Sequence, residues 1–256
     1  YAINDGKVVF VKSMTDYGLG RVHAELLDVL ADTVRVLEKN QLPYSAMCGT
    51  LLGAVRHRGF IPWDDDVDLV LPRDSYDRFA ALYPTQCGQG FTLDLTDTWV
   101  PRVRKADGDA FVDLFILDPL PQGAVTRAWK LFRLRMLQGM LKKQVDYRRF
   151  SFDKRLLLWG TNLLGLPFSR QSLLAAYARV ARTGASGSQL HMSDGAFNLL
   201  TMAFDRDTFA NPIPTPFETL ILRVPRDAGT VLTSLYGPDY MTPPPENERR
   251  PLHLDR

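Results

Sequence analysis

The chain has 256 residues, 45% of them apolar and 23% charged, which is enough apolar material for one globular core of ordinary size. A formal net charge of +2 is too small to predict a nucleic-acid binder. Cys48 and Cys87 have no metal-ligand spacing to each other or to the four histidines, which argues against a zinc site and a disulfide framework. Neither a signal peptide nor an apolar run of 18 residues occurs, so the sequence predicts no membrane span and a cytoplasmic protein.

The first predicted elements are a helix and a strand that lead into a glycine-containing turn. Apolar residues recur at helical spacing between residues 22 and 37, and residues 44–47 predict a short strand. Residues 48–50 predict a tight turn, followed by a helix over 51–57 that Gly59 ends. With Gly49 and Thr50 in its first turn, this helix would offer N–H groups and a hydroxyl to a phosphate. The same two residues are also typical of a plain helix start.

Four carboxylates then occupy five positions: Asp64, Asp65, Asp66 and Asp68. In an extended strand alternate side chains share a face, so Asp64, Asp66 and Asp68 point one way and Asp65 the other. Three carboxylates on one face form an oxygen-rich site for a hard divalent cation, and Mg²⁺ prefers carboxylates combined with substrate phosphates. The alternative, a solvated acidic turn, does not explain the apolar residues on both sides of the run.

Further along, Pro72 opens a predicted helix over 73–83, which Pro84 stops. Strands are predicted at 91–95, 99–105 and 111–117. The last of these places Asp113 on one face with two aromatic residues, Phe111 and Phe115. An aspartate there is costly to bury unpaired, so we expect a metal, a cation or a substrate hydroxyl beside it. The alternative is an aspartate that accepts backbone hydrogen bonds at a strand end.

Two arginines before that strand, Arg102 and Arg104, share a strand face and could neutralise the charge of a diphosphate. A surface role suits them equally. Arg56, at the end of the helix over 51–57, is a further candidate for reaching phosphates.

The middle of the chain is basic and apolar. Between Arg127 and Phe168 ten Lys or Arg residues stand against two acids, Asp146 and Asp153, and aromatic and aliphatic residues are interleaved with them. This pattern predicts a helical pair that lies on an anionic membrane surface or binds an anionic acceptor. An ordinary helical subdomain with a solvated basic face is the alternative. The first reading adds a peripheral position on the inner face of the membrane to the predicted cytoplasmic location.

The C-terminal third predicts a strand over 221–224, a helix over 227–236 that ends at Gly237, and an extended tail after three prolines at 243–245. His253 near the last residue is given no catalytic role.

At four places the sequence resembles the LicD proteins, which are bacterial phosphorylcholine transferases, and their fukutin-related relatives. The core match is CGTLLGAVRHRGFIPWDDDVDLVLPRDSYDRF at residues 48–79. FVDLFILD at 111–118, Phe217-Glu218 and LYGPDYMTPPP at 235–245 add to it. The resemblance touches most of the chain and leaves residues 120–195 unaccounted for.

The predicted helices and strands give an α/β (α+β) organisation, and the resemblance implies the fold of the nucleotidyltransferase superfamily, a mixed sheet flanked by helices. It implies one catalytic domain over residues 1–256 with a basic helical insertion at about 120–195. The superfamily pattern is a Gly-Ser or Gly-Thr turn, an Asp-x-Asp strand and a third carboxylate on a neighbouring strand. Here those positions are Gly49 and Thr50, then Asp66 and Asp68, then Asp113. Asp64 also matches an acidic position and is expected to bind metal directly or through water.

The reaction that the resemblance implies is a phosphotransfer assisted by Mg²⁺, with Mn²⁺ as an alternative ion. A CDP-linked donor such as CDP-choline would bind over Gly49 and Thr50, and a hydroxyl of a glycan or glycolipid would attack, as in lipopolysaccharide or teichoic acid biosynthesis. Catalysis is expected from Asp66, Asp68 and Asp113, and the metal from these three with Asp64. Arg56 and Arg104 are the candidates for phosphate. For choline an aromatic cage is expected, with Trp63, Trp99 and Tyr44 as candidates.

Two other functions stay open from the sequence. One is transfer of a nucleotide itself, which would use the same carboxylates. The other is a non-catalytic glycan- or membrane-binding module of the same fold, which the complete acidic set disfavours. No nucleic-acid partner is expected.

Overall fold

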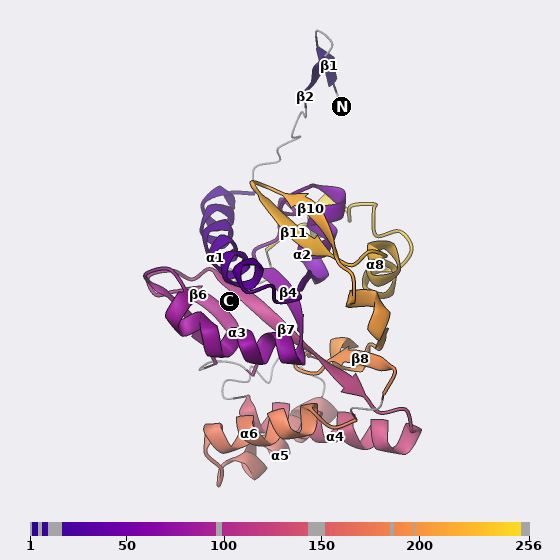
Figure 1. Ribbon diagram of the computed structural model, residues 1–256. Helices are drawn as coiled ribbons and strands as arrows, with labels where there is room; N and C mark the ends of the chain where they lie inside the picture. The colour runs from indigo at the N-terminus through magenta and orange to yellow at the C-terminus, as the bar shows by residue number, and fades with distance from the viewer. Residues whose placement is uncertain are drawn as a thin grey trace.

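A mixed β-sheet forms the centre of the molecule (Figure 1). The computed structural model describes residues 2–4, 7–9, 17–95, 99–142, 152–184, 187–196 and 198–251. Strands run in the order β3-β4-β7-β6-β5, and β8 pairs with β7 and β9 with β8. The pair β4 and β7 is parallel, and the other pairs are antiparallel. The strands of this sheet are β3 (Ser45–Ala46), β4 (Val67–Pro72), β5 (Phe91–Asp94), β6 (Arg102–Lys105), β7 (Phe111–Leu120), β8 (Gln189–Met192) and β9 (Phe204–Asp205).

The helices form two groups. Helices α1 (Gly20–Lys39), α2 (Cys48–Arg56) and α3 (Arg73–Gln86) pack on the sheet. Helices α4 (Ala124–Leu141), α5 (Phe152–Gly165) and α6 (Arg170–Ala181) form a separate layer, at the bottom of Figure 1, which we call the helical layer. α7 (Asn198–Thr201) and α8 (Ala228–Tyr236) follow it in the chain. Two antiparallel ribbons complete the structure: β1 (Ala2–Asn4) with β2 (Lys7–Val9), and β10 (Ile213–Phe217) with β11 (Leu220–Val224). Among the described residues, no helix is long and apolar enough to cross a membrane.

Burial on both faces explains the composition of the central strands. β4 and β7 read VDLVLP and FVDLFILDPL, and almost all of their residues are buried. Parallel strands covered by helices on both sides are expected to be continuously apolar in this way, so each aspartate within them stands out. The main core joins these strands to α1, α2, α3 and the C-terminal ribbon, and a smaller core lies within the helical layer.

Three local predictions were wrong. Pro84 does not stop α3 but lies inside its last turn, where the helix continues to Gln86. Because Pro84 lies so close to the end of the helix, it disturbs few backbone hydrogen bonds. The residue with positive φ after α2 is Arg58, not Gly59. Gly59 instead leaves room for the Glu218 carboxylate, which an added Cβ would overlap. Strand β10 was missed because its two prolines disfavour a strand, and in this ribbon they are tolerated.

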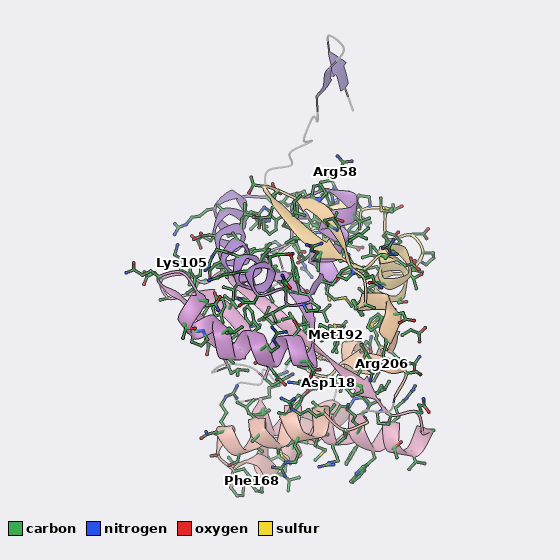
Figure 2. The ribbon with its side chains drawn as sticks, in the orientation of Figure 1. Arg58, Lys105, Asp118, Phe168, Met192 and Arg206 are labelled. Atoms are coloured by element: carbon green, nitrogen blue, oxygen red, sulfur yellow. The ribbon has the colours of Figure 1, made fainter. Side chains whose placement is uncertain are left out.

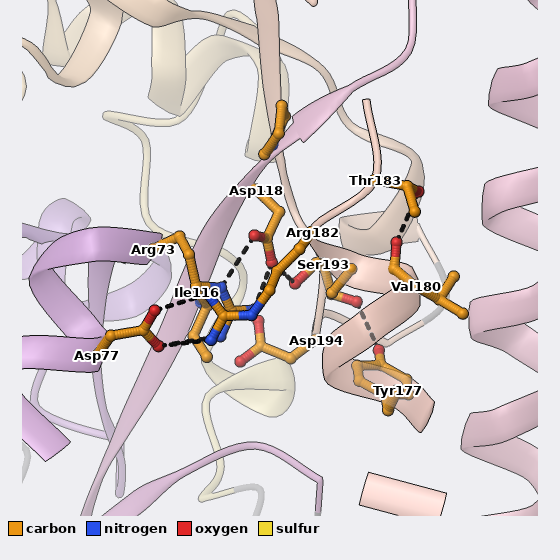
Figure 3. Close-up of polar contacts among 12 residues, drawn as sticks. Arg73, Asp77, Ile116, Asp118, Tyr177, Val180, Arg182, Thr183, Ser193 and Asp194 are labelled. Carbon is orange, nitrogen blue, oxygen red and sulfur yellow. Dashed lines mark hydrogen bonds and ion pairs between the residues drawn. The ribbon is translucent and has the colours of Figure 1, made fainter. Parts of the chain in front are cut away.

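A buried polar network joins the sheet to the helical layer (Figures 2 and 3). Asp118, at the end of β7, accepts hydrogen bonds from Arg73 Nε at 2.9 Å and Nη2 at 2.5 Å, and from Ser193 Oγ at 2.6 Å. Lys130 of α4 donates to three backbone carbonyls, those of Pro119, Ala181 and Thr183. Burial lowers the pKa of Lys130 to about 8. This lysine, counted in the basic pattern, is therefore a structural residue of the joint and not part of a solvated face.

Asp194 is a fully buried carboxyl in the same joint. Its Oδ1 accepts the Ile116 N–H at 2.9 Å, and Oδ2 has no hydrogen-bond partner among the described residues. Burial raises its pKa from the ordinary carboxyl value of 3.8 to about 8. Between those pH values the folded protein retains a proton that the unfolded chain releases, so this residue lowers stability as pH rises. Burial also lowers the pKa of His191 to about 4, and that residue acts in the opposite direction.

We therefore expect Asp194→Asn to gain stability relative to the natural protein as pH rises from about 4 to about 8. The gain should reach on the order of a few kcal/mol, because one unit of pKa shift corresponds to about 1.4 kcal/mol and the asparagine does not titrate. Urea unfolding at several pH values measures the difference, from which the His191 contribution cancels. The control Asp207→Asn, at an exposed position, should show the same pH dependence of the free energy of unfolding as the natural protein. A difference between Asp194→Asn and the natural protein that does not change with pH would contradict the expectation.

Candidate active site

Two neighbouring parallel strands place Asp68 and Asp113 side by side. The register of β4 and β7 pairs these two residues directly, and both are buried. Neighbouring strands lie about 4.8 Å apart, so two carboxylates at paired positions strongly affect each other. The expected third carboxylate on a strand adjacent to the Asp-x-Asp strand is thus present at Asp113.

The acidic run enters this pair from the N-terminal side of β4. Asp64 and Asp66 precede the strand, which begins at Val67. Burial raises the pKa of Asp68 well above its usual range, and the charges of Asp66, Asp113 and Asp64 raise it further. Asp65 is also buried. Four carboxylates therefore gather at the start of β4 and β7.

Helix α2 brings its first turn against these carboxylates. It begins at Cys48, so Gly49 and Thr50 lie inside the first turn and not in a turn before it. A Cβ added at Gly49 would overlap the Asp64 carboxylate, so glycine permits this close approach. Thr50 Oγ1 accepts the Asp68 N–H at 2.8 Å. The negative group beside this turn is therefore the protein's own Asp64, and phosphate binding there stays a prediction.

Cys48 is buried next to the same group of acids. Its thiol pKa is raised well above the usual value, first by burial and then by Asp68, Asp66 and Asp64. A thiol with a raised pKa is a weak nucleophile. Cys48 therefore serves packing at the helix start.

Arg102 pairs with Asp113 across neighbouring strands. Its Nε lies 2.6 Å from Asp113 Oδ1 and its Nη2 3.2 Å from Oδ2, while its guanidinium stacks 3.9 Å from the Phe111 ring centroid. This is the cation that the sequence led us to expect beside Asp113. Arg104 lies two residues further along β6 and forms an ion pair with Asp94 at 3.4 Å. Of the two arginines, Arg102 therefore contacts the acidic site, and a substrate-binding role for Arg104 stays a prediction.

Arg56 and Trp63 lie together at the rim. Arg56 Nη1 donates to the Tyr240 carbonyl at 2.9 Å, and its guanidinium lies 5.9 Å from the Trp63 ring centroid. Burial lowers the pKa of Arg56, and Asp64 is among the charges that act on it. Arg249, from the C-terminal tail, covers the same tryptophan ring at 5.1 Å. The C-terminal segment therefore closes over this edge of the site.

The three aromatic candidates for a choline cage are held by separate contacts. Trp63 is next to Tyr17, with ring centroids 5.8 Å apart. Trp99 donates its indole N–H to the Asp194 carbonyl at 2.8 Å, in the joint with the helical layer. Tyr44 is buried beside Glu38 and Arg223. Of the three, Trp63 is the one that lies beside the acidic site, against Arg56.

Three further residues help to position the acids or lie beside them. The sequence did not predict a role for any of the three. His23 of α1 contacts the Asp64 carbonyl through Nε2 at 2.8 Å and stacks on Phe60, with ring centroids 4.5 Å apart. Glu218 accepts the Phe60 N–H at 3.1 Å. Tyr236 lies near the acids, whose charges raise its pKa after burial does. Tyr236 and Glu218 fall in runs that the resemblance includes, which was a usable signal, whereas His23 had none.

A divalent metal fits the chemistry of this donor set. In the part of the chain that the structure describes, no group of three or more His, Cys, Asp or Glu side chains is arranged as a metal site as it stands. However, the four carboxylates act on one another electrostatically, and Asp68 is buried among them. Carboxylate oxygens are the ligands that Mg²⁺ prefers, and a cation would relieve their repulsion. Asp64, Asp66 and Asp68 are the residues that would hold it, with Asp113 paired beside Asp68.

Comparisons with known proteins agree with this geometry. Residues 41–117 match the family described as LicD/FKTN/FKRP, nucleotidyltransferase domain, a range that contains every carboxylate of the site. The "Lipopolysaccharide cholinephosphotransferase LicD" of Haemophilus influenzae is 25% identical over 259 residues, covering 89% of this chain and 93% of that protein. An uncharacterized protein of Rickettsia typhi is 34% identical over 91 residues, 36% of this chain and 28% of that protein.

Among solved structures, a crystal structure of ANT(2")-Ia in complex with adenylyl-2"-tobramycin aligns with 60% of this chain and 97% of that one, at 13% identity and a TM-score of 0.30. This likeness is too low to carry an argument. The matched range and the similarity along most of the sequence show that residues 41–117 carry a LicD-type nucleotidyltransferase domain and that the chain is similar to a LicD protein over most of its length.

Proposed function

We propose that this protein is a metal-dependent phosphotransferase that moves a phosphorylcholine-type group from a CDP-linked donor to a hydroxyl of a cell-surface glycan or glycolipid. One observation carries the proposal: Asp64, Asp66, Asp68 and Asp113 gather against the first turn of α2, in a chain whose similarity to a lipopolysaccharide cholinephosphotransferase covers 89% of its length. Phosphoryl transfer depends mainly on positioning and charge stabilisation, and this arrangement supplies both.

The donor diphosphate would bind where α2 begins. The first N–H groups of a helix have no partner within the helix, and the helix dipole favours an anion there. At Gly49 the Asp64 carboxylate occupies the space that a side chain would fill, and Thr50 fixes the start of β4 through its bond to the Asp68 N–H. Arg56 lies at the rim, where a guanidinium can pair with phosphate oxygens.

The choline group would bind against an aromatic face. Quaternary ammonium groups bind over aromatic rings, most strongly over tryptophan. The Trp63 ring already carries two cations, the guanidinium groups of Arg56 and Arg249. A trimethylammonium group has the same charge and could take the place of Arg249, which comes from the tail.

The carboxylates would perform the chemistry. Asp66 and Asp68 would hold the Mg²⁺, with Mn²⁺ as an alternative, and a bound ion would neutralise phosphate charge and polarise the phosphoryl oxygens. The acceptor hydroxyl oxygen forms a bond to the phosphorus that bears the choline, and the bond from that phosphorus to the CMP oxygen breaks. Asp113 would accept the hydroxyl proton, as a general base within hydrogen-bond reach. Arg102, bound to both oxygens of Asp113, would orient that carboxylate.

A panel of CDP-linked donors tests the proposal. The purified protein is incubated with Mg²⁺ and either CDP-choline, CDP-ribitol or CDP-glycerol, with and without a lipopolysaccharide preparation as acceptor. We expect CMP release from CDP-choline that increases when acceptor is added and stops in excess EDTA. Phosphorylcholine should be recovered on the acceptor.

The products also distinguish the two alternative functions. Transfer of the nucleotide from CDP-choline would place CMP on the acceptor and release free phosphorylcholine. A non-catalytic binding module would release neither product, although it could still bind the donor. Either result would overturn the proposal, and preference for CDP-ribitol or CDP-glycerol would keep the reaction type and change the transferred group.

A further inference from the structure

Large apolar side chains are exposed mainly on the helical layer. Trp129 and Phe132 of α4 are 58% and 52% exposed, and their rings stack with centroids 5.6 Å apart. Phe168, just after α5, lies on the side of the layer away from the sheet (Figure 2). In the described part of the chain, only Ile221, Tyr236 and Met241 are comparably exposed elsewhere. The exposed apolar side chains of the helical layer and of the turn after α5, which together we call the outer helical face, are Val125, Trp129, Phe132, Trp159, Leu163, Leu164, Leu166 and Phe168.

The segment that carries this face is strongly basic. Residues 119–184 contain 13 Lys or Arg and two Asp, a formal charge of +11, whereas the rest of the chain contains 18 Lys or Arg and 27 Asp or Glu, a charge of −9. α4 and α6 contain no acid at all. Arg133 and Arg135 of α4 are exposed beside the outer helical face. The nearly neutral chain is therefore divided into a basic helical layer and an acidic remainder.

We propose that the outer helical face docks on the surface of an anionic lipid bilayer. Exposed Trp, Phe and Leu side chains on a basic helix are typical of elements that lie in the membrane interface. A second copy of the chain is disfavoured as the occupant, because it would bring one basic layer against another. A soluble anionic glycan would satisfy the arginines but leave the apolar side chains in water. A bilayer with anionic headgroups satisfies both.

Docking in this way would also set the distance between the membrane and the acceptor hydroxyl, an inference that rests on the proposed function. α4 follows β7 after a short turn, and Asp113 lies seven residues before Leu120, the last residue of that strand. At about 3.3 Å per residue, the acidic site lies on the order of 20 Å from the helical layer along the strand. The reachable hydroxyl would then be on a sugar several units away from the lipid.

Co-sedimentation with vesicles tests the docking face. The protein is mixed with vesicles of phosphatidylglycerol and phosphatidylcholine, or of phosphatidylcholine alone, at 0.05 M and 0.5 M salt. We expect binding to the anionic vesicles at low salt and release at high salt, because electrostatic attraction to lipid is screened within a Debye length. Arg133→Gln with Arg135→Gln should weaken binding roughly thirtyfold, and Trp129→Ser with Phe132→Ser at least about tenfold.

A matched control removes the same charge elsewhere. Arg78→Gln with Arg226→Gln changes two exposed arginines outside the helical layer and should leave binding unchanged. Thermal unfolding checks that each variant folds. The proposal is overturned by absent binding at low salt, by equal binding to neutral vesicles, or by binding that ignores both helical-layer variants. The proposal would also be overturned if the protein formed a stable dimer that dissociates in the double variant Trp129→Ser with Phe132→Ser.

Vesicle binding is measured without donor or acceptor. Its outcome is therefore independent of whether the protein transfers phosphorylcholine. Lys143, another basic residue of this segment, and its neighbours to residue 151 lie outside the described residues, so the variants are confined to described positions.

Discussion

Asp68→Asn is expected to abolish turnover while leaving the fold intact. Asp68 is buried among three other carboxylates, and the asparagine would remove a proposed metal ligand and a negative charge at the centre of the group. Loss of several kcal/mol of charge stabilisation in the transition state corresponds to roughly a hundred- to thousandfold in rate. The rate of CMP release from CDP-choline measures this loss of turnover. Asp66→Asn should behave in the same way.

Stability distinguishes this explanation from simple damage to the fold. Neutralising one of several repelling carboxylates relieves strain in the metal-free protein, so Asp68→Asn should unfold at the same or a higher temperature in EDTA. Added Mg²⁺ should raise the unfolding temperature of the natural protein and raise that of the variant less. Asp74→Asn, an exposed aspartate at the start of α3, is the matched control and should keep its activity. A metal role for the acidic run would be refuted if Asp68→Asn turned over as fast as the natural protein, or if the natural protein kept its turnover in excess EDTA.

Asp113→Asn is expected to lower kcat by roughly a hundred- to thousandfold, with little change in the Michaelis constant for the donor. If Asp113 accepts the proton of the acceptor hydroxyl, its interaction matures only in the transition state. Steady-state rates at varied donor concentration separate the two constants. An unchanged kcat with a raised donor Michaelis constant would instead give Asp113 a role in donor binding.

The ion pair with Arg102 requires its own control. Asp113→Asn leaves a partly buried guanidinium without its carboxylate, which costs stability regardless of catalysis. Arg102→Gln removes the other half of the pair and keeps the carboxylate. We expect Arg102→Gln to lower stability by about as much as Asp113→Asn but to retain more turnover. Equal loss of turnover in both variants would mean that the pair acts as one structural unit and that Asp113 has no separate chemical role.

Part of the site followed from local sequence pattern. The acidic run, the glycine at the start of α2 and the strand with Asp113 were all predicted from residues close together in the chain. Short-range spacing fixes which side chains share a face of a strand or a turn of a helix, and this information is local. The α/β architecture followed for the same reason, and the family resemblance added the expectation that Asp113 lies beside the Asp-x-Asp strand.

Other features depend on register between distant segments. Arg102 and Arg104 share a strand face, and only the pairing of β6 with β7 places Arg102 opposite Asp113. Likewise, nothing near Lys130 in the sequence announces the three carbonyls that bury it, which come from β7 and from the end of α6. Such pairings are determined when elements pack, and the sequence pattern of one element does not contain them.

By itself, therefore, the sequence determined the kind of chemistry that this protein supports, because carboxylates, glycine and strand periodicity are local properties. Only the tertiary structure decided which charges meet. It joined Asp68 to Asp113 across 45 residues, brought His23 to the Asp64 carbonyl and placed Tyr236 near Asp64, Asp66 and Asp68. It also showed which apolar residues of the basic segment are buried and which are exposed, because burial depends on the neighbours that packing provides and not on the residue alone.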